Sequence, residues 1–170
     1  MADPRGPRRQ TVLGEIHGGP LRKVGPYADI VELDLATKEE RVVARAEESP
    51  VEILASGTEL YWLDIGDDGL RRVLKEGGEV TTIARVPAAG WFALSTDSIY
   101  VAGFTGLTVV PRDGGAPELL LRAGSFRAPN VAGQKDAVSA VSLVGNDLLW
   151  TVPTSATTSA LVRATRWARD

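Results

Sequence analysis

The chain has 170 residues, with 19 basic and 22 acidic side chains and a formal net charge of −3. This balance argues against a general nucleic-acid binder, and the length suits one domain with a substantial core. The absence of cysteine excludes disulfides and thiolate chemistry, and no apolar run approaches the roughly 20 residues that span a bilayer.

The N-terminal part begins with a stretch, residues 1–10, that is rich in proline, glycine and arginine and is expected to be a disordered lead-in. It lacks the apolar core of a secretory signal. Segment 11–46 is expected to hold part of a first repeat, because residues 30–35 alternate and a polar turn leads to the apolar run 41–45. The single histidine, His17, has no partner at a spacing that supports a base–nucleophile pair, so an exposed loop residue is favoured over a catalytic one.

Two complete repeats of four short strands follow, at 51–86 and 91–123. The first is expected to have strands at 51–55, 59–65, 70–74 and 80–85, and the second at 91–95, 98–103, 107–111 and 118–122. The repeats align at an offset of 37, which matches Arg85 with Arg122. Each has a glycine pair between its third and fourth strands, where positive φ angles favour a tight hairpin; these pairs are Gly77-Gly78 and Gly114-Gly115.

The last repeat is separated from the others by an expected loop at 124–136, and loops on a rigid scaffold often carry binding residues. This final partial repeat covers 138–167, with three expected strands at 138–144, 147–152 and 160–166. No fourth strand is evident before the sequence stops.

An apolar triplet after a polar turn occurs at the same place in three repeats: Leu60-Tyr61-Trp62, Ile99-Tyr100-Val101 and Leu148-Leu149-Trp150. A period near 40 with four short strands is the signature of a β-propeller. The sequence therefore predicts an all-β fold of four-stranded antiparallel propeller blades, with about three to four blades present. The repeated aromatic residues are expected to pack between blades rather than form a ligand cage, because stacking buries both faces of each sheet.

The number of blades leaves three interpretations open, since a ring needs at least four. The chain is a fragment of a longer propeller, or a second copy completes the ring as a homodimer. In the third interpretation, residues 11–24 finish a first blade and a small four-bladed ring closes.

The motif Tyr61-Trp62-Leu63-Asp64, followed by residues 68–73, resembles the YWTD-type blade, with Leu63 at the place of the family's threonine. The pattern is also similar to six-bladed TolB-like and NHL-like propellers and to bacterial propellers of unknown role. The resemblance covers 51–122 well and 138–166 more loosely. It implies that Asp64 braces adjoining strands by hydrogen bonds, and it allows a periplasmic or extracellular location.

Two acidic groups are candidates for cation binding. The turn at 64–69 hints at a calcium loop, but Gly66 and Lys75 stand where ligands are needed, so a simple turn is favoured and calcium is only an alternative cofactor. Some six-bladed propellers are lactonase-like hydrolases with a central metal held by carboxylates and an asparagine. Glu52, Asp97, Asn130 and Asp136 are the residues that such a site would draw on here.

The arginines Arg45, Arg85 and Arg122 recur at the end of the last strand of three repeats. Such arginines can grip anionic ligands, but pairing with neighbouring acids or capping of the sheet edge is favoured.

Exposed aromatic and arginine side chains are expected around the loop 124–136, and these residue types dominate interface hot spots. The candidate binding residues are Trp91, Phe126, Arg127 and Asn130. We find no catalytic constellation and assign no metal ligand. The sequence therefore favours a non-catalytic module that binds a protein or peptide. The alternative is a propeller hydrolase or lyase with a metal in its central channel.

Overall fold

The computed structural model describes residues 10–16, 28–47, 49–122, 138–153 and 159–165, and these form four antiparallel sheets. Sheet A contains β1 (Gln10–Ile16), β2 (Ala28–Leu33) and β3 (Glu40–Glu47). Sheet B contains β4 (Pro50–Ser56), β5 (Glu59–Asp64), β6 (Gly69–Leu74) and β7 (Thr81–Arg85). Sheet C contains β8 (Ala89–Leu94), β9 (Ser98–Gly103), β10 (Gly106–Pro111) and β11 (Glu118–Arg122). Sheet D contains β12 (Ser139–Val144), β13 (Asp147–Pro153) and β14 (Ser159–Thr165).

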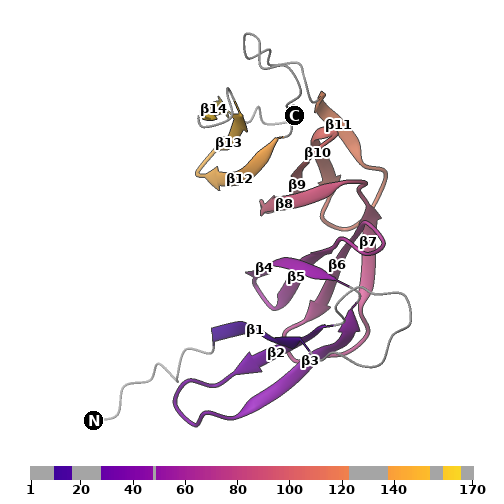
Figure 1. Cartoon of the computed structure of the whole chain (residues 1–170), viewed down its shortest axis with the longest axis vertical. Coiled ribbons are helices and arrows are strands. Elements are labelled where there is room, and N and C mark those ends of the chain that lie inside the picture. The colour runs from indigo at the N-terminus through magenta and orange to yellow at the C-terminus, as the bar shows by residue number, and fades with distance from the viewer. Residues whose placement is uncertain (1–9, 17–27, 48, 123–137, 154–158, 166–170) are drawn as a thin grey trace.

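The sheets follow one another along an arc, with sheets A and D at its two ends (Figure 1). Within sheets B and C the strands pair in sequence order, so each sheet is a meander. The first strands β4, β8 and β12 lie beside one another on the inner side of the arc. The fold is therefore all-β and built of propeller blades, as the sequence predicted, and the described sheets form an incomplete ring. Among the described residues, none forms a helix with the length and hydropathy of a membrane span.

The sheets repeat the same irregularities, which fixes the equivalence between them. In β7, Ile83 is an extra residue opposite β6, because Leu70 pairs with Ala84 while Arg71 pairs with Thr82. The same bulge occurs in β3 and in β11. Sheet A thus corresponds to the second, third and fourth strands of sheet B, and sheet D corresponds to the first three.

The innermost strands β4, β8 and β12 of sheets B, C and D each carry a bulge as well. The extra residue is Glu52 in β4 and Gly90 in β8, and the irregular stretch of β12 includes Ala140. Glu52 and Ala140 both have positive φ angles, of 42° and 53°. A bulge bends its strand and increases the local twist, so the innermost strand is bent in each of these three sheets.

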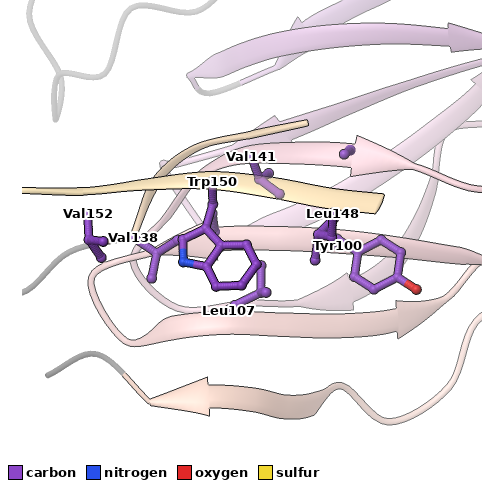
Figure 2. Close-up of a cluster of buried hydrophobic side chains, with 9 residues drawn as sticks. Tyr100, Leu107, Val138, Val141, Leu148, Trp150 and Val152 are labelled. Atoms are coloured by element: carbon purple, nitrogen blue, oxygen red, sulfur yellow. The ribbon is translucent and has the colours of Figure 1, made fainter. Parts of the chain in front are cut away.

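The apolar core lies between the sheets, in three clusters that each join two neighbours. Trp62 is buried between sheets A and B, and Tyr61 between sheets B and C. Trp150 lies among Val138, Leu107 and Val152 between sheets C and D (Figure 2). The prediction that the repeated aromatic residues pack between blades is confirmed.

The glycine pairs behave as predicted. Gly77 and Gly78 have φ angles of 90° and 128°, and Gly114 and Gly115 have φ angles of 103° and 139°. Strand bounds differ from those expected by one or two residues: β8 begins at Ala89 rather than Trp91, and Gln10 already belongs to β1.

Candidate functional site

One end of sheets B and C carries the exposed apolar side chains that are the main feature of the candidate site. We call this end the loop face and define it by the β5–β6 turn, the β9–β10 turn and the beginning of β8. Antiparallel pairing places these segments together, because Asp64 is opposite Gly69 and Gly103 is opposite both Gly106 and Ala89. The exposed residues are Ile65 (50%), Phe104 (59%) and Trp91 (37%).

A short chain of hydrogen bonds through Ala88 holds the loop face together. The amide of Ala88 donates to Asp68 Oδ1 of sheet B at 3.1 Å, and its carbonyl accepts from the amide of Phe104 in sheet C at 3.1 Å. The carbonyl of Gly103 then accepts from the amide of Val138 at 3.1 Å, which joins the residue preceding sheet D. The turn that carries Phe104 is therefore fixed to sheet B and to the entry of sheet D.

Close packing at the same place requires glycine. A Cβ atom on Gly103 would lie 2.2 Å from the carbonyl oxygen of Ala88, a distance that no side chain tolerates without backbone movement. Ala88 itself has a φ of 59°, which alanine rarely adopts. Such strain persists only where surrounding contacts over-determine the conformation, and the hydrogen bonds of Ala88 supply those contacts.

The acidic turn of sheet B is held by arginines. Arg85 makes an ion pair with Asp67 Oδ2 at 3.0 Å, and Arg71 makes one with Asp67 Oδ1 at 3.1 Å. Burial alone would raise the pKa of Asp67, but Arg71, Arg85 and the amide of Gly69 outweigh it and lower that pKa. The structural interpretation of Arg85 as a partner of a neighbouring acid is confirmed.

Asp64 is buried and braces the start of sheet B. Its Oδ1 accepts from the amides of Ser49 at 3.1 Å and Gly66 at 3.0 Å, and its Oδ2 lies 3.6 Å from Arg71. The role that the YWTD resemblance implied for this residue is therefore present. With Asp64 and Asp67 both engaged in these contacts, the geometry is that of a braced turn between two strands.

The candidate binding residues from the sequence fall in two regions. Trp91 lies on the innermost strand of sheet C, at the end that belongs to the loop face. Phe126, Arg127 and Asn130 lie outside the described residues, so their role stays a prediction. The residues that flank that segment, Arg122 and Val138, both lie at the loop face, since Arg122 pairs with Gly106 and Val138 bonds to Gly103.

The residues that a metal hydrolase would draw on are not brought together where the structure describes them. Glu52 lies on the bulge of β4 near the loop face, whereas Asp97 lies in the β8–β9 turn at the opposite end. Glu52 Oε2 accepts from the amide of Phe92 in sheet C at 2.6 Å. Burial raises the pKa of Glu52, and the bond from Phe92 opposes this rise. Asn130 and Asp136 lie outside the described ranges, within which no cluster of three potential ligands occurs.

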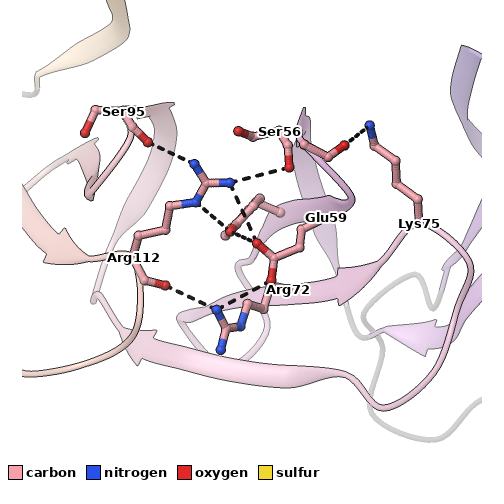
Figure 3. Close-up of polar contacts among 8 residues, drawn as sticks. Ser56, Glu59, Arg72, Lys75, Ser95 and Arg112 are labelled. Carbon is pink, nitrogen blue, oxygen red and sulfur yellow. Dashed lines mark hydrogen bonds and ion pairs between the residues drawn. The ribbon is translucent and has the colours of Figure 1, made fainter.

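A polar network that the sequence analysis missed joins sheets B and C at the end opposite the loop face (Figure 3). Arg112 donates from Nε to the Tyr61 hydroxyl at 2.7 Å and lies over the Tyr61 ring at 4.9 Å. It also donates to the carbonyls of Ser95 at 3.0 Å and Ser56 at 3.4 Å, and lies 3.7 Å from Glu59 Oε2.

The Tyr61 hydroxyl in turn donates to Glu59 Oε2 at 2.5 Å. Burial raises the pKa of Tyr61 and the bond to Glu59 adds to this rise, while Arg112 opposes it. No sequence motif announces this network, because its members are contributed by strands and turns of two different repeats.

Comparisons with known proteins support the fold. No protein-family model and no curated protein matches the sequence. Among solved structures, a chain of a nidogen/laminin complex matches with a TM-score of 0.57 and 19% identity, over 74% of this chain and 50% of that chain. A chain in a structure of S. cerevisiae Dbp5 bound to Nup159, Gle1, IP6 and ADP matches with a TM-score of 0.58 and 14% identity, over 93% of this chain and 42% of that one.

Apo AztD from Citrobacter koseri matches more distantly, with a TM-score of 0.42 and 16% identity, over 78% of this chain and 41% of that one. The chain spans half or less of the length of each of these structures. The matches with TM-scores of 0.57 and 0.58 place the chain by its fold in the class of β-propeller-like proteins, and at 19% and 14% identity they leave the activity to be argued from the site.

Proposed function

We propose that the chain is a non-catalytic binding module whose loop face docks a protein or peptide. One observation carries the proposal: Ile65, Phe104 and Trp91 are large, exposed and apolar. Ile65 and Phe104 stand on turns fixed by backbone hydrogen bonds, and Trp91 stands on strand β8. A rigid site loses little conformational entropy on binding, and aromatic side chains beside arginine are typical of interface hot spots. Arg85, whose side chain is 64% exposed, lies at the same end of sheet B.

A likeness of fold gives secondary support. The nidogen/laminin match is a complex between proteins, so a sheet arrangement of this kind occurs in a protein that binds another protein. The alternative of a metal hydrolase has less support, because Glu52 accepts from the amide of Phe92 and Asp97 lies at the other end of the strands.

A peptide library displayed on phage provides a defined probe for the loop face. Peptides selected on the intact chain are expected to bind the Phe104→Ser and Ile65→Ser variants more weakly than the parent chain. Loss of a hot-spot side chain costs at least about 2 kcal/mol, so the dissociation constant should rise about 30-fold.

Leu74→Ser is the matched control, because Leu74 is also exposed, at 53%, but lies at the opposite end of sheet B. Its binding should equal that of the parent chain. Selected peptides that bind Phe104→Ser and Ile65→Ser as tightly as the parent would contradict the proposal.

A further inference from the structure

Each contact between neighbouring sheets joins two different kinds of face. We call the face toward the following sheet the forward face and the opposite one the backward face. The forward faces include Leu70 in sheet B and Leu107 in sheet C, and the backward faces include Val73 in sheet B and Val110 in sheet C. Among the described strands, none covers the forward face of sheet D or the backward face of sheet A (Figure 1).

The third strand of sheet D carries an aliphatic residue at the position where sheet B has Leu70. Leu63 pairs with Leu70 in sheet B, and Thr151 pairs with Leu161 in sheet D, so Leu161 is the equivalent of Leu70. Leu70 is fully buried against sheet C, whereas Leu161 is 69% exposed. Sheet D thus presents an aliphatic side chain in the position that sheet B uses for packing against a following sheet.

The backward face of sheet A belongs to the complementary kind. The shared bulge of the outer strands makes Leu33 the equivalent of Val73 and Val110, which are both buried against a preceding sheet. Leu35, two residues beyond, stands where sheet C has Arg112 and is 43% exposed. Val42 of β3 is exposed as well, at 36%.

The polar groups of these two faces also match. In sheet B, Glu59 lies 3.6 Å from Arg72 and accepts from the Tyr61 hydroxyl of its own sheet, and Arg112 of the next sheet lies 3.7 Å from it. In sheet D, Arg163 holds the equivalent acid, Asp147, at 2.5 Å, and the Thr165 hydroxyl donates to it at 2.8 Å. An acid satisfied within its own sheet can face an aliphatic residue such as Leu35 without leaving an unpaired charge at the interface.

We propose that a second copy of the chain packs its sheet A, backward face inward, on the forward face of sheet D. The same contact occurs twice, since each copy offers one face of each kind, and the two arcs then close into one ring with two-fold symmetry. Closure covers Leu161, Leu33 and Leu35 and leaves no open sheet face at the ends of the arc. This inference does not depend on the binding role of the loop face.

Light scattering during size-exclusion chromatography tests the pairing. The intact chain should have about twice the 18.1 kDa mass of one copy. Leu161→Asp and Leu33→Lys should each be monomeric, because a charge placed in an apolar contact should raise the dissociation constant by about 30-fold or more. An equimolar mixture of the two variants should regain the dimer, since one contact is then intact and the other joins Asp to Lys.

Leu119→Asp is the control, because Leu119 is 42% exposed on the outer strand of sheet C and should leave the dimer unchanged. Circular dichroism checks that each variant is folded, and the exposed Leu35→Lys replaces Leu33→Lys if that variant does not fold. A monomeric intact chain, a dimer that survives Leu161→Asp, or a mixture that stays monomeric would each overturn the proposal.

Discussion

Replacing Arg112 with alanine tests whether the polar network is a principal contact between sheets B and C. The guanidinium donates to the Tyr61 hydroxyl and to the carbonyls of Ser95 and Ser56, and 19% of the side chain is exposed. Hydrogen bonds from a charged donor contribute about 1.5–3 kcal/mol each, but bonds of one group are not additive. The ion pair with Glu59 adds little, because both partners are partly solvated.

We therefore expect Arg112→Ala to lower the free energy of unfolding by about 3 kcal/mol. Urea denaturation followed by circular dichroism measures this change. With a slope of about 2 kcal/mol per molar urea, the midpoint should fall by about 1.5 M. Arg112→Lys should restore less than half, because an ammonium group cannot reproduce the planar fork of donors.

Arg122→Ala is the matched control, since this arginine is exposed and should change stability by no more than about 0.5 kcal/mol. A double-mutant cycle of Arg112→Ala with Tyr61→Phe should give a coupling energy of about 1 kcal/mol or more. A loss below about 1 kcal/mol for Arg112→Ala would refute the reasoning, because such a value is ordinary for a surface side chain.

Three further changes test other features. Gly103→Ala should lower the free energy of unfolding by about 2 kcal/mol in thermal or urea unfolding, because its Cβ atom would clash with the Ala88 carbonyl. Gly114→Ala is the control, because a Cβ atom there meets no atom within 4 Å and the change should show only the cost of a positive φ. The pKa of Glu52 is raised above its ordinary 4.5, so the folded protein favours the neutral carboxyl group. Glu52→Gln should therefore be more stable than the parent at pH 7, and this gain should vanish as the pH falls below about 4. A difference in stability between Glu52→Gln and the parent that is the same at both pH values would contradict the burial effect. The pKa of Asp67 is lowered below its ordinary 3.8, so the ionised carboxylate stabilises the fold above that pH, and this stabilisation is lost as the pH falls through the lower folded pKa. Asp67→Asn should therefore be less stable than the parent at pH 6. In an acid titration, the stabilities of the two proteins should converge below about pH 4.

The sequence predicts the blades well because their signals are local. Alternation, polar turns and the glycine pairs are all contained within one repeat, and the resulting strands lie within one or two residues of their expected bounds. The burial of Tyr61 and Trp150 follows from their repeated position, since equivalent strands of stacked sheets meet the same neighbours.

Features that depend on two sheets could not be predicted in the same way. The positive φ of Ala88 has no sequence signal, because alanine is not a residue that turn rules place in that conformation. Glu52 is a candidate metal ligand only through the similarity to lactonase-like propellers, and the bulge of β4 explains why its carboxylate reaches the amide of Phe92. Exposure of Ile65 and Phe104 likewise depends on how the turns of two sheets meet at one end.

The serial order of the sheets has a consequence for how the chain comes apart. Each apolar cluster joins only neighbouring sheets, so cohesion along the arc is a sum of separate junctions, as in a linear array. Opening then begins at an end, where a sheet has one junction to break, and reaches the B–C junction last. In the isolated chain, amide hydrogens of β5 and β9 should exchange most slowly, and those of β14 should exchange early.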